Sequence, residues 1–240
     1  MSMSATPRPH AVAVVLAAGL GARVGADGNK AYLRIAGRSM VAWSIDTLAR
    51  VPEIARTVLV FRRGEFELAR DTLRREVPTA TVEFVEGGDT RHASETNVLR
   101  HLATDIDSGA IDVVVIHDAA RPVAGPDMFV TALSVAREFG GAIPAIPAAD
   151  VVRTRNGDDI ESLTGSATLV RVQTPQAFRA PALLRAYRAA EREGFEGTDT
   201  SSCVEEFTDA EVRTFRGEQR NLKVTYARDI EVAERLLTRR

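Results

Sequence analysis

The chain has 240 residues, of which 45% are hydrophobic, and its formal net charge is −2. This length and apolar content suffice for one sizeable α/β domain with a closed core, and the near balance of charge gives no basic excess for nucleic acid or an anionic membrane. A single cysteine excludes an internal disulfide framework, and we expect a cytoplasmic protein, since no apolar run approaches the roughly 20 residues of a membrane span.

Apolar runs alternate with helical patterns along most of the chain. Residues 1–10 are polar, lack the apolar core of a signal peptide and are expected to be disordered, whereas 11–240 are predicted to form one domain. Short apolar runs predict strands at 11–18, 57–61, 81–85, 113–117 and 142–148. Helical spacing of apolar residues predicts helices at 39–50, 65–76, 91–103 and 126–139. The alternation predicts a Rossmann-like α/β fold, a mostly parallel sheet with helices on both faces.

The strand-helix pattern breaks between residues 150 and 171. Asn156-Gly157 is a strong hairpin signal, so a two-stranded β-arm over about 145–171 is predicted to protrude from the domain. Because a lone hairpin is marginal in water, this favours an arm that dimerises with a second copy; the alternative is a flexible surface hairpin. Beyond the arm, the pattern predicts helices at 181–193 and from about 229, and strands at 212–215 and 222–225.

The segment Leu16-Ala-Ala-Gly-Leu-Gly-Ala-Arg23 follows the first strand, and Lys30 comes seven residues later. Gly19 and Gly21 let backbone N–H groups approach a phosphate closely, and the two cations add the positive charge that a polyphosphate needs. The spacing matches neither a Walker A loop nor the dinucleotide fingerprint, whose third glycine would come one residue earlier. The motif indicates a phosphate-binding loop of another kind; the alternative is an ordinary turn with two solvated cations.

Further candidates follow later strands, where open parallel sheets bind ligands. Asp118 directly follows strand 113–117 and suits Mg²⁺, which takes one or two carboxylates together with phosphate oxygens; the alternative is a turn or capping aspartate. Lys223 supplies a third cation or faces solvent, and Arg121 and Arg171 suit an anionic acceptor or structural ion pairs. Together these residues indicate phosphoryl or nucleotidyl transfer, which depends on positioning and charge neutralisation.

Six motifs occur in an order that resembles one family. They are Leu16-Ala-Ala-Gly-x-Gly-x-Arg23 with Lys30, Gly87-Gly88-Asp89-x-Arg91, His117-Asp118-Ala119-Ala120-Arg121-Pro122, Thr174-Pro175-Gln176, Thr198-Asp199 and Leu222-Lys223-Val-Thr225. From about Val12 to the C-terminus the chain resembles the 2-C-methyl-D-erythritol 4-phosphate cytidylyltransferases, and ribitol-5-phosphate cytidylyltransferases share most of the motifs. The resemblance implies a fold of the nucleotide-diphospho-sugar transferase type and transfer of CMP from CTP to a polyol phosphate, with release of pyrophosphate, in non-mevalonate isoprenoid biosynthesis.

The resemblance also implies roles for single residues. Arg23, Lys30 and Lys223 would be catalytic, and Asp118 would hold Mg²⁺ or another divalent cation. The implied nucleotide-binding residues are Ala17, Ala18, Gly19, Gly21, Gly88, Asp89, Ser94 and Ala119. The implied acceptor-binding residues are Arg121, Asp150, Arg153, Arg171, Thr174 and Thr198. The implied assembly is a homodimer in which the arm completes the acceptor pocket of the second subunit.

Departures from the family pattern gather in the acceptor half. Val151 follows Asp150 where the family usually has threonine, and Ser166 stands where it usually has an arginine for the acceptor phosphate. In the nucleotide half, Ala93 replaces a frequent aspartate and Asn29 replaces the usual proline. Methylerythritol phosphate is the expected acceptor; the alternatives are ribitol 5-phosphate or another polyol phosphate, and a CTP-binding protein that has lost turnover.

Overall fold

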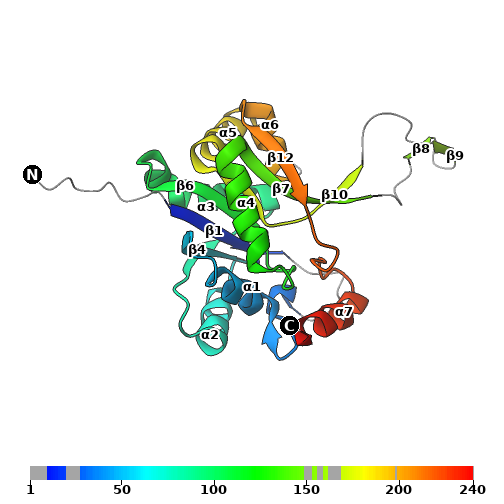
Figure 1. The fold of residues 1–240 in the computed structure, drawn as a ribbon. Coiled ribbons are helices and arrows are strands. Elements are labelled where there is room, and N and C mark those ends of the chain that lie inside the picture. Colours follow the sequence, from blue (N-terminus) through cyan, green and yellow to red (C-terminus); the bar gives the residue numbers. More distant parts are fainter. Residues whose placement is uncertain are drawn as a thin grey trace, which may run out of the picture.

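The computed structural model describes residues 10–19, 28–148, 153–155, 159–161, 169–197 and 199–239, with 153–155 and 159–161 described as backbone (Figure 1). The main sheet consists of β1 (His10–Leu16), β4 (Ile54–Phe61), β5 (Glu83–Glu86), β6 (Ile111–Asp118), β7 (Gly140–Pro147), β10 (Val170–Val172), β11 (Gln176–Arg179) and β12 (Glu211–Arg216). The helices are η2 (Lys30–Tyr32), α1 (Met40–Leu48), α2 (Phe66–Glu76), α3 (Arg91–Asp107), α4 (Pro126–Phe139), α5 (Ala180–Glu193), α6 (Thr200–Phe207) and α7 (Ala227–Thr238).

Strand pairing makes the sheet mostly parallel, as predicted. Its order is β10-β7-β11-β6-β1-β4-β5, and β12 pairs with β7. β1 lies parallel to β4 and β6, β4 is parallel to β5, and β7 is parallel to β12. Two strands run antiparallel to their neighbours: β11, inserted between β6 and β7, and β10, which pairs with β7 at the edge.

Successive side chains of β1 enter different halves of the core, because a strand alternates its two faces. Ala11, Ala13 and Val15 pack into a cluster that includes residues of α1, α2 and α4. Val12 and Val14 pack into a second cluster with residues of α3, α5 and α6. Helices therefore cover both faces of the sheet, which confirms the predicted fold class and explains why this strand is apolar at every position.

The five strands and four helices predicted before the arm are all present, with ends shifted by a few residues. Residue Ser39 caps α1 as its sequence position suggests, accepting a hydrogen bond from the Ala42 N–H. Sequence reasoning missed η2, β10, β11 and α6, which are short, and the small β2–β3 pair (Arg34–Ile35 and Arg38–Ser39).

The predicted strand at 222–225 is wrong. This segment is irregular, and its Val224 N–H donates to the Ala120 carbonyl at 2.8 Å rather than entering a ladder. Its apolar members Leu222 and Val224 pack instead in a third cluster with residues of α7. A short apolar stretch looks the same whether it pairs with a strand or covers the base of a helix.

The predicted hairpin is confirmed at the backbone of the arm. β8 (Arg153–Arg155) pairs antiparallel with β9 (Asp159–Glu161), with Arg153 opposite Glu161 and Arg155 opposite Asp159. The turn residues Asn156 and Gly157 lie outside the described residues. Dimerisation through the arm stays a prediction. No helix in the described part of the chain is long and apolar enough to cross a membrane.

Candidate active site

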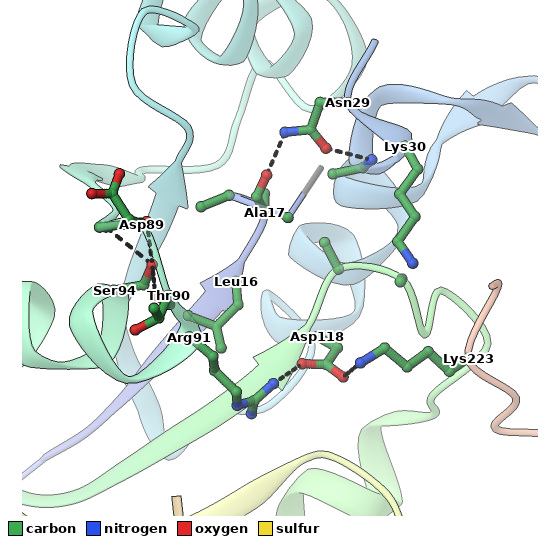
Figure 2. Close-up of a pocket in the computed structure, with 16 residues that line it drawn as sticks. Leu16, Ala17, Asn29, Lys30, Asp89, Thr90, Arg91, Ser94, Asp118 and Lys223 are labelled. Carbon is green, nitrogen blue, oxygen red and sulfur yellow. Dashed lines mark hydrogen bonds and ion pairs between the residues drawn. The ribbon is translucent and has the colours of Figure 1, made fainter. Parts of the chain in front are cut away.

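A cavity of about 460 Å³ opens at the carboxyl ends of β1 and β6, beside the start of α3 (Figure 2). It is lined by residues 16–19, 29–31, 88–91 and 118–120, with Ser94 and Lys223. The sequence-predicted site residues that it brings together are Ala17, Ala18, Gly19, Lys30, Gly88, Asp89, Ser94, Asp118, Ala119 and Lys223. This edge of the sheet is where open parallel sheets bind ligands.

One end of the cavity lies between β5 and α3, where Gly88, Asp89 and Ser94 line it. The Ser94 hydroxyl donates to the Thr90 carbonyl at 2.9 Å and accepts from the Gly88 N–H at 3.1 Å. A Cβ on Gly87 would lie 2.7 Å from the Ala18 Cβ, and one on Gly88 would lie 2.5 Å from the Ala93 Cβ. Both glycines are therefore required by the close approach of the β5–α3 turn to its neighbours.

Asn29 fixes the segment that carries Lys30. Its amide nitrogen donates to the Ala17 carbonyl at 2.5 Å and to a carboxylate oxygen of Glu65 at 2.7 Å, while its amide oxygen caps η2. Lys30 then reaches across the cavity, and its Nζ donates to the Val224 carbonyl at 3.0 Å. Asn29, which stands where the family usually has proline, thus links the end of β1 to the segment that carries Lys30.

Asp118 lies at the charged end of the cavity and is held by two cations. Arg91 Nη1 is 2.6 Å from Oδ1, and Lys223 Nζ is 2.8 Å from Oδ2 (Figure 2). Burial alone would raise the pKa of this carboxyl, but the charges of Arg91 and Lys223 outweigh it and hold the pKa well below its usual range. The predicted metal ligand is therefore an ionised carboxylate whose two oxygens are both ion-paired.

Thr174 lies behind Asp118 rather than in the cavity. Its hydroxyl accepts from the Asp118 N–H at 3.0 Å and lies 3.1 Å from Nδ1 of His117, and the residue is only 3% exposed. His117 is fully buried against Phe129, and burial lowers its pKa to about 4. The Thr174 hydroxyl therefore holds Asp118 in this structure, and its implied contact with an acceptor stays a prediction.

The two predicted acceptor arginines with described side chains do not line the cavity. Arg121 is largely buried, its Nη1 donates to the Asn221 carbonyl at 2.8 Å, and its Nε lies 3.9 Å from Asp118. Arg171 lies on β10 and is exposed. Arg121 thus holds the segment leading to Lys223, since Asn221 is two residues before it.

Other predicted site residues fall outside the description. Gly21, Arg23, Asp150 and Thr198 lie outside the described residues, and Arg153 is described only through the backbone of β8. Their implied roles stay predictions.

Arg91 is the main site residue to which sequence reasoning assigned no role. It follows the Gly87-Gly88-Asp89 motif, occupies the first position of α3, lines the cavity and reaches Asp118. An arginine placed directly after a glycine turn that precedes a helix was the available signal, but its partner lies 27 residues away and is found only by folding.

Comparison with known proteins places this geometry in a family. Residues 11–239 match the family model described as IspD, 2-C-methyl-D-erythritol 4-phosphate cytidylyltransferase. A protein of that name from Solibacter usitatus is 35% identical over 94% of this chain and 95% of its own length. Another, from Cereibacter sphaeroides, is 36% identical over 94% of this chain and 96% of its own length.

Solved structures agree with the sequence comparison. The 4-diphosphocytidyl-2C-methyl-D-erythritol synthase of Anaerococcus prevotii superposes with a TM-score of 0.81 at 27% identity, covering 96% of each chain. The 2-C-methyl-D-erythritol 4-phosphate cytidylyltransferase of Thermus thermophilus superposes with a TM-score of 0.70 at 27% identity, covering 94% of this chain and 98% of that one. The similarity therefore extends over nearly the whole chain, both in sequence and in fold.

Proposed function

We infer that this chain, which belongs to the 2-C-methyl-D-erythritol 4-phosphate cytidylyltransferase family, is a nucleotidyltransferase that moves CMP from CTP to 2-C-methyl-D-erythritol 4-phosphate in the isoprenoid pathway that bypasses mevalonate. One observation carries the proposal beyond family membership. A single cavity joins a slot lined by Gly88, Asp89 and Ser94 to an end where Lys30 and Lys223 lie beside Asp118. A nucleoside triphosphate has the same two parts, a base at one end and phosphates at the other.

The slot at Gly88 and Ser94 is the proposed site for cytosine. Backbone groups of the β5–α3 turn and the Ser94 hydroxyl offer donors and acceptors of fixed direction. Asp89 lines the same part of the cavity, and Ala119 lies at the end of β6, where a ribose would pass. Ala17, Ala18 and Gly19 complete the wall on the β1 side.

The charged end is the proposed site of the reaction. A phosphate oxygen of the acceptor attacks the α-phosphorus of CTP; the new P–O bond forms as the bond to the β-phosphate breaks, and pyrophosphate leaves with that electron pair. Lys30, Lys223 and the predicted Arg23 neutralise the charge that spreads over the phosphate oxygens. The acceptor needs no general base, because a phosphate monoester with a second pKa of about 6 is largely a dianion at pH 7.

Lys223 has to exchange partners in this scheme. Its ammonium lies on Asp118, yet its side chain is 41% exposed and can turn towards an incoming phosphate. Lys30 Nζ donates to the neutral Val224 carbonyl, and a charged phosphate oxygen would be a stronger acceptor for the same ammonium. Both lysines therefore approach the phosphates from the side of the 221–226 segment.

A divalent cation fits this site only if phosphate oxygens supply most of its ligands. Among the described residues, no group of three or more acidic, histidine or cysteine side chains is placed to hold a metal. Asp118 is the carboxylate at the charged end, and Mg²⁺ in such sites takes one or two carboxylates with phosphate oxygens and water. We propose that Asp118 holds Mg²⁺ brought with CTP, where the ion would neutralise phosphate charge; Lys223 would then release Oδ2.

The test is pyrophosphate release with CTP and Mg²⁺ against methylerythritol 4-phosphate, ribitol 5-phosphate, erythritol 4-phosphate and glycerol 3-phosphate. We expect a strong preference for methylerythritol 4-phosphate. Preference for ribitol 5-phosphate would mean that the chain catalyses the same reaction on a different acceptor. The departures from the family pattern at Val151 and Ser166 favour this alternative. CTP binding without turnover on any acceptor would overturn the proposal that the chain is an enzyme. Activity that a metal chelator does not change would overturn the proposed requirement for Mg²⁺.

A further inference from the structure

A buried glutamate stands directly behind the charged end of the cavity. Glu95 lies one helical turn beyond Arg91 on α3, is 1% exposed and does not line the cavity. Its Oε1 lies 2.9 Å from Arg91 Nε and accepts from the Thr200 hydroxyl at 2.9 Å, while its Oε2 accepts from the Tyr187 hydroxyl. Three groups, one each from α3, α5 and α6, thus meet at one carboxylate.

A carboxylate in this place is costly, because burial disfavours its charged form and raises the pKa of Glu95, against the opposing charge of Arg91. Holding three helices together would not require a charge, since apolar side chains of similar volume do so at least as well. The distinctive effect of a carboxylate here is on the guanidinium beside it.

Arg91 is held between two carboxylates. Its Nε edge lies on Glu95 at 2.9 Å, and its Nη1 lies on Asp118 Oδ1 at 2.6 Å. With Lys223 on the other oxygen of Asp118, the charges alternate from the interior to the cavity: Glu95, Arg91, Asp118, Lys223. Figure 2 shows the cavity half of this series, with Arg91 and Lys223 approaching Asp118 from opposite sides.

We propose that Glu95 is a positioning residue for cytidylyl transfer, which fixes Arg91 on Asp118 so that this carboxylate keeps a cationic partner when Lys223 moves to the phosphates. The inference rests on the proposed function, in which Lys223 changes partners. A guanidinium ion-paired through Nε with a buried carboxylate is restrained from following Lys223 towards the triphosphate. Without Glu95, Arg91 is free to bind phosphate itself, and Asp118 then loses the cation on its Oδ1.

The decisive variant is Glu95→Gln, which keeps the size of the side chain and can still bond to Tyr187 and Thr200 but removes the charge that holds Arg91. We expect kcat to fall at least ten-fold, with a smaller change in KM for CTP and little change in Tm. The matched control is Glu191→Gln, which removes an exposed glutamate of α5 that pairs with Arg100 of α3 away from the cavity. It is expected to keep wild-type kinetics.

A double-mutant cycle separates positioning from general support of the fold. In an Arg91→Gln background, Glu95→Gln is expected to change kcat less than two-fold, because its only route to the reaction is already broken. Independent, multiplicative losses in the two variants would overturn the proposal. So would wild-type kcat in a folded Glu95→Gln protein.

A crystal structure of Glu95→Gln tests the same point without turnover. In the complex with CTP, we expect the Arg91 guanidinium to leave Asp118 for the triphosphate, and an unchanged Arg91–Asp118 contact in that complex would overturn the proposal. This keeps two failures apart. An inactive wild-type enzyme would contradict the proposed function, whereas an active wild type with an unperturbed Glu95→Gln variant would contradict only the role of Glu95.

Discussion

At the scale of single residues, the charged end of the cavity depends on the groups that hold Asp118. Asp118 is held by Arg91 and Lys223, and its backbone N–H is held by Thr174. These contacts keep the carboxylate ionised and fixed while one of its two cations remains partly exposed. Lys223 can therefore turn from Asp118 to a phosphate with little rearrangement of the rest of the protein.

Lys30→Ala tests the cation on the opposite wall. The ammonium is proposed to neutralise charge formed in the transition state, and losing one such donor typically lowers kcat by about 10²–10³-fold. The fold should survive, because Lys30 lies at the edge of the cavity and outside the apolar clusters of the core. Pyrophosphate release and thermal unfolding give the two readouts. Arg34→Ala removes an exposed cation four residues away and should leave both unchanged; near-normal kcat in Lys30→Ala would refute its role.

His117 gives the protein a specific acid sensitivity. Burial lowers its pKa to about 4 from the usual 6.5, while Asp118 opposes this shift and Arg121 adds to it. Between pH 6.5 and 4 the unfolded chain therefore takes up a proton at His117 that the folded protein does not. The contribution of neutral His117 to the free energy of unfolding is fully present above pH 6.5 and is lost as the pH falls towards 4. The loss amounts to roughly 3 kcal/mol at most.

The measurement is the free energy of unfolding by denaturant at pH values from 4 to 7, for wild type and His117→Gln. The variant should show a shallower dependence on pH in this range. His10→Gln, at an exposed position on β1, should keep the wild-type slope. An identical slope in His117→Gln would show that other groups carry the acid sensitivity.

At the scale of elements, the start of α3 is where sheet, nucleotide slot and ion pairs meet. Thr90 caps the helix by accepting from the Ala93 N–H, Arg91 turns to Asp118, and Ser94 turns back to the β5 turn. One helical turn therefore sets the geometry of both ends of the cavity. Displacement of this turn should affect both binding of CTP and its reaction.

Gly88→Ala is designed to displace that turn. The added Cβ would lie 2.5 Å from the Ala93 Cβ and 3.1 Å from its carbonyl carbon, so the helix start has to move. We expect a loss of about 1–3 kcal/mol in stability, as for other overpacked sites, and a weaker affinity for CTP by titration calorimetry. Gly125→Ala is the control, because its Cβ would meet nothing within 4 Å. Unchanged CTP affinity in Gly88→Ala would contradict the proposed cytosine slot.

At the scale of the whole molecule, the sheet and its covering helices account for the cavity, and the arm extends beyond them. β10 continues from the arm into the sheet, pairing with β7 through Val170–Val172. Leu169, Val170 and Val172 are each at least 40% exposed. Apolar side chains at the root of a hairpin that is marginal alone support the proposal that a second copy packs there.

Deletion of residues 152–168 tests the arm. We expect the shortened protein to elute as a monomer, measured by light scattering during size-exclusion chromatography, and to lose activity if the arm completes the acceptor pocket of its partner. Removal of residues 1–9 is the control and should preserve both the dimer and turnover. An active dimer without the arm would refute the intersubunit role.

The features that the sequence determined by itself are those that depend on patterns within a few neighbouring residues. Apolar runs and helical spacing predicted most of the sheet and helices, and the glycine and charged motifs, through their resemblance to one family, indicated Lys30, Asp118 and Lys223 as members of one site. These inferences succeed because periodicity and turn chemistry act over a few residues, and because the carboxyl ends of parallel strands meet at one edge.

What only the tertiary structure decided was the choice of partners between distant segments. β11 enters the sheet antiparallel between β6 and β7, residues 222–225 cover α7 instead of forming a strand, and Thr174 turns inward to Asp118. The link from Glu95 through Arg91 to Asp118 is of the same kind. The sequence does not show which partner a charged or hydroxyl side chain will bond to. Folding buries these groups together, and each can then bond only to partners within hydrogen-bond distance.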